Sequence, residues 1–135
     1  MQGRKYKISI VTICFNDLKE LKRTCVSVDS QRQKPDEHLI INASTKPDID
    51  DFLRSIKLPE YRHWENIKDE HISASFNEGI LRSRGDVIHL LNAGDEYYDE
   101  SVIERVSSEF EKDEKLMWTH GNYVQYRGGI WVLTG

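Results

Sequence analysis

The chain has 135 residues, of which 38% are hydrophobic, with 19 basic and 23 acidic side chains and a formal net charge of −4. This length predicts one globular domain over residues 1–135, because a single core then buries about two thirds of the unfolded surface. Its apolar runs are far shorter than the ~20 residues that cross a bilayer, and it lacks the basic face typical of nucleic-acid binding. We therefore exclude a transmembrane protein and expect no nucleic-acid partner.

The N-terminus and the two cysteines bear on the cellular compartment. Arg4, Lys5 and Lys7 lead into one short strand-like run without a cleavage pattern, so no secretory signal is expected. Cys14 and Cys25 form neither a CxxC motif nor a zinc pattern, which predicts two reduced thiols. We expect a cytoplasmic protein.

The first half of the chain predicts two strand–helix units. Residues 7–15 form an apolar run rich in β-branched side chains, as in a strand buried on both faces of a parallel sheet. Apolar residues at steps of three and four then predict a helix over 18–30. A second buried strand is expected at 39–41, followed by a helix that has Asp48 as its cap and that Pro59 ends.

The second half continues this alternation after a stretch that predicts little. Residues 61–70 could hold one short strand at most. A helix is expected over 73–84, with Gly85 at positive φ directly after it, and a clear strand follows at 86–91. Apolar periodicity predicts a further helix through 102–110.

The chain closes with a hairpin pattern, in which apolar and aromatic runs flank Arg127-Gly128-Gly129. Alternating strands and helices imply right-handed crossovers and a three-layer α/β/α architecture around a mostly parallel sheet. Ligands of such sheets bind outside the carboxyl ends of the strands. The candidate site therefore lies in three turns, at Phe15-Asn16, Asn42–Thr45 and Asn92–Glu96.

The residues of these turns restrict the chemistry. Neither a GxGxxG fingerprint nor a GxxxxGK[ST] phosphate loop is present, which excludes dehydrogenases and P-loop proteins of the usual kind. Phe15 and Asn16 suit stacking on a base and hydrogen bonding to it, although residue type alone favours Asn16 as a helix cap. Asp95, next to Glu96, could coordinate a hard cation that holds a diphosphate, or could be an exposed turn acid without a role.

Four blocks of the sequence carry a resemblance. In order they are KISIVTICFND, LIINAST, ISASFNEGILRSRGDVIHLLNAGDEYYD and THGNY. Together they cover nearly the whole chain and resemble the N-terminal half of the inverting family-2 glycosyltransferases, which have the Rossmann-like GT-A fold. The likeness is strongest to bacterial enzymes of polysaccharide, capsule and lipopolysaccharide assembly.

The resemblance implies a nucleotide-sugar site. Asn42 lies where the family usually has an Asp that bonds the uracil ring, so the identity of the base is left open. His71 lies near a position where some relatives have a basic base-contacting residue, and Asn77 with Gly79 matches a helix beneath the sugar diphosphate. The implied nucleotide-binding residues are Thr12, Phe15, Asn16, Asn42, His71 and Asn77.

The resemblance also implies a metal site, because Asn92–Asp95 occupies the position of the family's Asp-x-Asp-Asp motif. Asn92, Ala93 and Gly94 would lie against the donor sugar and diphosphate, and Asp95 is the retained metal ligand. With one firm carboxylate, Mg²⁺ or Mn²⁺ would bind mainly together with the diphosphate.

The implied reaction transfers a sugar with inversion from a nucleotide-diphosphate donor, expected to be a UDP-sugar, to a hydroxyl of a glycan or lipid-linked acceptor. In relatives the general base follows the last matched block. We therefore expect it beyond residue 135 and expect the fragment alone to be inactive. Lipid-linked acceptors imply peripheral association with the inner face of the membrane, although no basic amphipathic helix in the sequence supports it.

Two other classes stay open. Because Asn42 and Asn92 replace two expected acids, the chain could be a non-catalytic nucleotide-sugar-binding module or pseudo-enzyme. Binding that does not depend on metal would favour that reading. A flavodoxin-like or receiver-like domain rests only on the alternation of elements, since the acid cluster and phosphoacceptor of receivers have no match.

Overall fold

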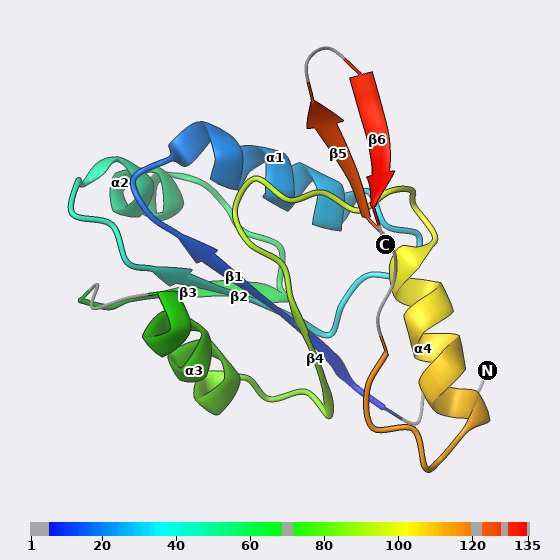
Figure 1. The fold of residues 1–135 in the computed structure, drawn as a ribbon. Coiled ribbons are helices and arrows are strands. Elements are labelled where there is room, and N and C mark those ends of the chain that lie inside the picture. Colours follow the sequence, from blue (N-terminus) through cyan, green and yellow to red (C-terminus); the bar gives the residue numbers. More distant parts are fainter. Residues whose placement is uncertain (1–5, 69–71, 120–122, 128–129, 135) are drawn as a thin grey trace.

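Strands and helices alternate along the chain as far as β4 (Figure 1). The computed structural model describes residues 6–68, 72–119, 123–127 and 130–134. The strands are β1 (Ile8–Cys14), β2 (Glu37–Asn42), β3 (Arg62–Asn66), β4 (Val87–Leu90), β5 (Tyr123–Arg127) and β6 (Ile130–Thr134). The helices are α1 (Leu18–Asp29), α2 (Asp48–Ser55), α3 (Ile72–Arg82) and α4 (Val102–Lys112). Within the described ranges, no helix is long and apolar enough to cross a membrane.

The first four strands form one sheet in the order β3-β2-β1-β4, and every neighbouring pair is parallel. β1 and β2 are therefore central, and the carboxyl ends of all four strands point toward one edge. The register places Cys14 opposite Asn42, and Asn42 opposite Asn66. β5 and β6 pair antiparallel in a separate sheet, which confirms the predicted hairpin.

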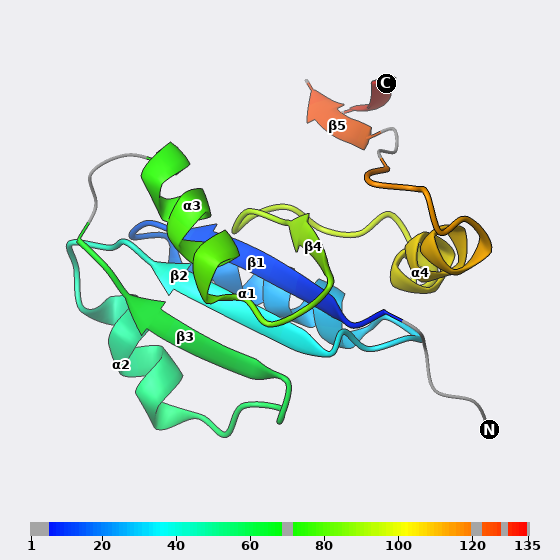
Figure 2. The ribbon, with the colours of Figure 1, turned by 90° about the horizontal axis from the view of Figure 1, so that it is seen from below.

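Helices cover both faces of the parallel sheet (Figures 1 and 2). Every residue of β1 and β2 is buried, as expected for central strands of such a sheet. The face toward α1 and α2 buries a cluster of Cys14, Leu21, Ile40, Ile49 and Leu53. The opposite face, covered by α3, buries Val11, Ile13, Leu39 and Ile41. These layers confirm the predicted α/β/α architecture.

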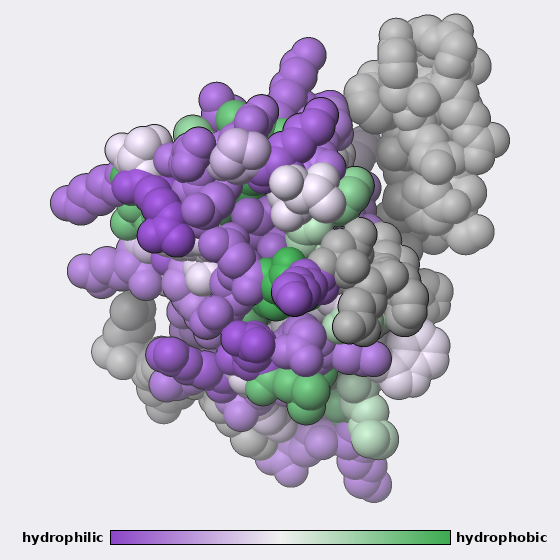
Figure 3. Space-filling model, turned by 90° about the vertical axis from the view of Figure 1, so that its left-hand side faces the viewer, coloured by the Kyte–Doolittle hydropathy of each residue, from purple (hydrophilic) through white to green (hydrophobic). Residues whose placement is uncertain are grey.

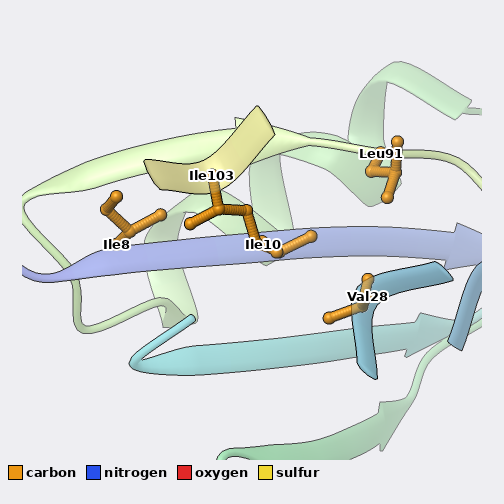
Figure 4. Packing of buried hydrophobic residues seen from close by; sticks show 5 residues of the cluster. All are labelled: Ile8, Ile10, Val28, Leu91 and Ile103. Carbon is orange, nitrogen blue, oxygen red and sulfur yellow. The ribbon is translucent and has the colours of Figure 1, made fainter. Parts of the chain in front are cut away.

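A third buried cluster joins α4 to the sheet (Figure 4). Ile103 of α4 lies with Ile8 and Ile10 of β1, Val28 of α1, and Leu91 directly after β4. None of these side chains is more than 7% exposed. Leu91 precedes the turn at 92–96 and Ile103 follows it, so the core anchors the chain on both sides of that turn.

Close backbone approach, and not helix geometry, explains Gly85. The predicted positive φ at this residue is wrong, since Gly94 is the one glycine of the described residues with positive φ. Gly85 donates its N–H to Ser9 Oγ at 2.7 Å, and a Cβ built on it would lie 2.4 Å from the same oxygen. A side chain at this position would therefore collide with β1.

Two predicted helix caps are displaced by one residue. The cap of α1 is Asp17, whose carboxylate accepts the N–H of Glu20 at 3.1 Å, and Asn16 has another role described below. α2 begins at Asp48 itself, after Pro47, and its first turn has no side-chain cap. The acidic side chains of that turn still interact favourably with the positive end of the helix dipole.

Candidate functional site

The turns after β1, β2 and β4 meet at one edge of the sheet, as the parallel topology predicts. The N–H of Ala43 donates to the carbonyl of Cys14 at 3.0 Å, and the N–H of Ala93 donates to the carbonyl of Ile13 at 3.0 Å. Figure 3 looks onto this end of the molecule, where the surface is mostly hydrophilic and hydrophobic side chains form small separate groups. The edge is therefore a polar surface assembled from distant parts of the chain.

Asn16 connects the turn after β1 to the turn after β2. It adopts a left-handed φ of 59°, and its N–H donates to Ser44 Oγ at 2.8 Å. Its side-chain oxygen accepts the N–H groups of Thr45 and Lys46 at 3.0 and 2.9 Å. The amide of Asn16 thus builds the loop, while the neighbouring Phe15 is 51% exposed and leaves its ring open to a stacking partner.

Asn42 is 4% exposed and lies in a chain of side-chain hydrogen bonds along the same edge. Its side-chain N–H donates to Asn66 Oδ1 at 2.9 Å, and its oxygen accepts the N–H of Ser44 at 3.2 Å. Asn66, at the end of β3, donates in turn to Asp50 at 2.7 Å. Sequence reasoning missed Asn66, because its strand contains too few apolar residues to be recognised.

The other residues matched to nucleoside binding are spread more widely. Thr12 is fully buried, and its hydroxyl hydrogen-bonds His38 Nε2 at 2.8 Å inside the core, so this hydroxyl does not reach the edge. Asn77 is exposed on α3. His71 lies outside the described residues.

The turn after β4 is built around Gly94, whose φ of +100° favours glycine. The N–H of Gly94 lies 2.8 Å from Thr24 Oγ1 and 3.2 Å from the carbonyl of Glu20, both in α1. The N–H of Asp95 donates to the carbonyl of Asn92 at 3.0 Å. The N–H groups that could have faced a phosphate are therefore bonded within the protein.

The acids around this turn differ in their partners. Arg23 of α1 pairs with Glu20 of the same helix at 2.8 Å and with Glu96 at 3.0 Å, which ties Glu96 to α1. The pKa of Asp95 is raised because partial burial disfavours its charge and Glu20 lies nearby. The backbone N–H of Asn92 also interacts with the Asp95 carboxylate and opposes this rise. Asn92 Oδ1 is buried without a hydrogen-bond partner among the described residues.

The side-chain oxygens of Asp95 and Asn92 fit a cation that is shared with a ligand. In the described part of the chain, no group of three His, Cys, Asp or Glu side chains is arranged to hold a metal ion by itself. Asp95 and Asn92 supply hard oxygen donors of the type that Mg²⁺ and Mn²⁺ accept, but too few to complete a coordination shell. A diphosphate would supply the others.

A groove of about 590 Å³ lies elsewhere, between α1 and α2. Its walls are mainly apolar and include Val26, Phe52 and Ile56. No residue predicted to bind nucleotide or metal lines it. The strand-end edge therefore remains the candidate site on chemical grounds.

The fold and this edge together define an α/β domain with a candidate ligand site at the carboxyl ends of parallel strands. The sequence model of glycosyl transferase family 2 matches residues 9–132, which is most of the chain. The chain belongs to this family, which confirms the resemblance found in the four sequence blocks.

Two uncharacterized glycosyltransferases of Mycobacterium tuberculosis, from strains CDC 1551 / Oshkosh and ATCC 25618 / H37Rv, are 31% identical to the chain over 97 residues. The match covers 71% of the chain. The chain spans 37% of the length of these curated relatives.

Solved structures show the same fold. The mannosyltransferase PcManGT from Pyrobaculum calidifontis, in complex with GDP-Man and Mn²⁺, matches with a TM-score of 0.65 at 8% identity, over 73% of this chain and 30% of its own. S. aureus TarS 1-349, in complex with UDP-GlcNAc, matches with a TM-score of 0.65 at 16% identity, over 78% and 31%. These likenesses confirm the predicted GT-A type of α/β fold.

Proposed function

We propose that the chain is the donor-binding part of an inverting glycosyltransferase that moves a sugar from a nucleotide diphosphate to an acceptor hydroxyl. The observation that carries the proposal is the turn at 92–95. The N–H groups of Ala93, Gly94 and Asp95 are bonded within the protein, so they do not cradle a diphosphate. The carboxylate of Asp95, which the backbone N–H of Asn92 also contacts, and the side-chain oxygen of Asn92 are the donors proposed for a cation, through which anionic oxygens would approach.

Mg²⁺ or Mn²⁺ would be held by Asp95, with Asn92 Oδ1 as a neutral second donor and diphosphate oxygens as further ligands. When bound, the cation supplies positive charge that stabilises the departing nucleotide diphosphate. The Mn²⁺ in the PcManGT complex supports divalent-metal use in this fold. The role of this chain would be to hold the oxygens of Asp95 and Asn92 in place, through the hydrogen bonds that Gly94 and the backbone of Asp95 make.

The nucleoside would lie beside the turns after β1 and β2. The exposed ring of Phe15 offers a stacking surface, and Asn42 with Asn66 offers amide donors and acceptors for the edge of a base. Asn16 shapes the loop between them. A UDP-sugar is the proposed donor, and the UDP-GlcNAc complex of TarS supports a nucleotide sugar as the donor class.

The proposed acceptor is a hydroxyl of a glycan or of a lipid-linked glycan, and the sugar transfer would take place at the inner face of the membrane. This part follows from the family resemblance. No residue of the chain is proposed as the general base, so the tests below measure binding of the donor nucleotide and not turnover.

The first test is calorimetric titration with UDP, once with Mn²⁺ and once with EDTA, with GDP and dTDP as base controls. We expect UDP to bind more tightly with Mn²⁺. The variant Asp95→Asn should lose about 10-fold or more of the Mn²⁺-dependent affinity, because a charged ligand of the cation becomes neutral. Asp51→Asn, an exposed acid of α2, is the matched control and should bind as the wild type does.

The outcomes separate the competing functions. No nucleotide binding under any condition would refute the proposal. UDP binding that EDTA leaves unchanged would instead favour a non-catalytic nucleotide-sugar-binding module, a class that the amides Asn42 and Asn92 already suggest.

A further inference from the structure

We propose that Thr24 of α1 is a positioning residue for the cation-binding turn, an inference that rests on the function proposed above. Thr24 is fully buried, and no sequence motif marks it. Its hydroxyl lies 2.8 Å from the N–H of Gly94 and 2.7 Å from the carbonyl of Asp95, with the carbonyl of Asn92 at 3.3 Å. One side chain thus contacts three residues of the turn, Asn92, Gly94 and Asp95.

The hydrogen-bonding capacity of a hydroxyl fits this arrangement. A threonine hydroxyl has one donor hydrogen and two acceptor lone pairs. It accepts from Gly94 and donates to Asp95, for which the shorter distance makes the carbonyl the preferred acceptor over that of Asn92. Because the N–H of Asp95 is also bonded, to Asn92, both backbone groups of this residue are fixed. These two bonds, one of them from α1, therefore fix the direction of the Cα–Cβ bond from which the carboxylate extends.

The rest of this α1 surface supports the same contact. Gly94 packs against α1 with a φ of +100°, which strains any other residue, and a Cβ built there would lie 2.4 Å from Glu20 Oε2, the mobile end of a side chain of α1. Arg23 links Glu20 to Glu96 on the far side of the turn. Thr24 is the buried centre of this contact, since Arg23 and Glu96 are both about half exposed, at 46% of their side-chain surface.

A loosened turn would affect the cation more than the base. The hydrogen bonds of the Thr24 hydroxyl go to the turn after β4, whereas the nucleoside groups Phe15, Asn42 and Asn66 lie at the ends of β1, β2 and β3. Removal of the hydroxyl leaves the N–H of Gly94 and the carbonyl of Asp95 without this partner, and Asp95 is no longer held in one orientation. Changes of this kind behind a metal ligand typically lower metal affinity by about 10- to 100-fold.

The test compares Thr24→Val, which keeps the shape and removes the hydroxyl, with Thr24→Ser, which keeps the hydroxyl. UDP is titrated into each protein with Mn²⁺ and with EDTA. We expect Thr24→Val to lose about 10-fold or more of the Mn²⁺-dependent gain in affinity. Thr24→Ser should retain that gain, and the affinity in EDTA should be equal in all three proteins.

Ser27→Ala is the matched control. Ser27 Oγ, also in α1, accepts the N–H of Tyr97 at 2.8 Å, so this variant loses a similar bond two residues beyond Asp95. It should be destabilised without losing the Mn²⁺-dependent gain. An equal loss in Ser27→Ala and Thr24→Val would show general loosening of the segment and overturn the inference.

Two further outcomes keep the proposals apart. If wild-type protein shows no Mn²⁺-dependent UDP binding, the proposed function fails whatever Thr24 does. If wild type shows it and a folded Thr24→Val variant shows it equally, the positioning role alone is refuted. Should that variant not fold, Thr24→Ser decides: a retained Mn²⁺-dependent gain supports the role of the hydroxyl, and loss of the gain with the hydroxyl still present refutes it.

Discussion

At the scale of single residues, the polar side chains at the strand ends form hydrogen bonds with one another within the protein. Asn16 holds the loop at Ser44 and Thr45, and Asn42 bonds Asn66. Their residue types and places at the ends of strands could be predicted from the sequence. Their partners could not, because each lies more than 20 residues away and carries no local signal.

Asn42→Ala tests the proposed base contact. An amide has two N–H donors, and Asn66 accepts one of them, which leaves the second for a carbonyl of the base. We expect the affinity for uridine, measured by calorimetry without metal, to fall by about 1–3 kcal/mol. Unfolding is measured in parallel, because the variant also loses the bonds to Asn66 and Ser44. An effect confined to recognition of the sugar would contradict the base contact.

At the scale of elements, apolar periodicity located the central strands and the helices, but not how closely they pack. α3 lies against the sheet through Ser75, which is 1% exposed, and through Gly79, while the larger Ile80 is 40% exposed. A Cβ on Gly79 would lie 2.3 Å from Val11 Cγ1. Small residues of this kind have no hydrophobic signal, whereas the predicted helix rests on Ile72, Phe76 and Ile80 at steps of four, of which Phe76 packs against the sheet.

Gly79→Ala should destabilise the fold for this reason. Alanine favours a helix over glycine by about 1 kcal/mol, but the collision with the buried strand residue Val11 costs about 1–3 kcal/mol. We expect a net loss in the free energy of unfolding, measured with urea. The double variant Gly79→Ala, Val11→Ala removes the collision and should be more stable than the sum of the two single changes implies. Strict additivity would contradict the close contact.

At the scale of the whole molecule, the alternation of elements was enough to predict a parallel α/β/α fold and the edge at which the turns after β1, β2 and β4 meet. The handedness of crossovers and the burial of parallel sheets are general, so they carry over to any such sequence. The support behind the edge is specific to this chain. Thr24 and Arg23 reach the turn after β4 from a helix about 70 residues earlier, a relation that only the folded structure reveals.

The central sheet also contains a buried histidine that should make the whole fold sensitive to acid. Nδ1 of His38 accepts the Nε–H of Arg62 at 2.9 Å, and its Nε2–H then donates to Thr12. Arg62 is ion-paired with Asp29 at 2.6 Å. Burial, with the neighbouring charge of Arg62, lowers the pKa of His38 to about 3, so the folded protein holds this ring neutral.

The unfolded chain takes up a proton at this histidine below a pKa of about 6.5, whereas the folded chain does not until about pH 3. Protonation thus favours unfolding. As the pH is lowered through that window, the free energy of unfolding decreases by up to about 1.4 kcal/mol per pH unit. Carboxylates with lowered pKa values, such as Asp29 and Glu37, act in the same direction but only below about pH 4.5, where they become protonated when unfolded. Between pH 6.5 and 5 the contribution of His38 to this dependence therefore exceeds that of these carboxylates.

His38→Gln should therefore flatten the dependence of unfolding free energy on pH between 6.5 and 5, although the variant is less stable at every pH. Urea unfolding at several pH values measures the slope. His89→Gln provides the comparison, since burial alone lowers the pKa of His89, without a neighbouring cation, and its removal should flatten the slope less. Equal slopes in wild type and His38→Gln would mean that this ring gains a proton without unfolding, and that the core can accommodate a charge beside Arg62.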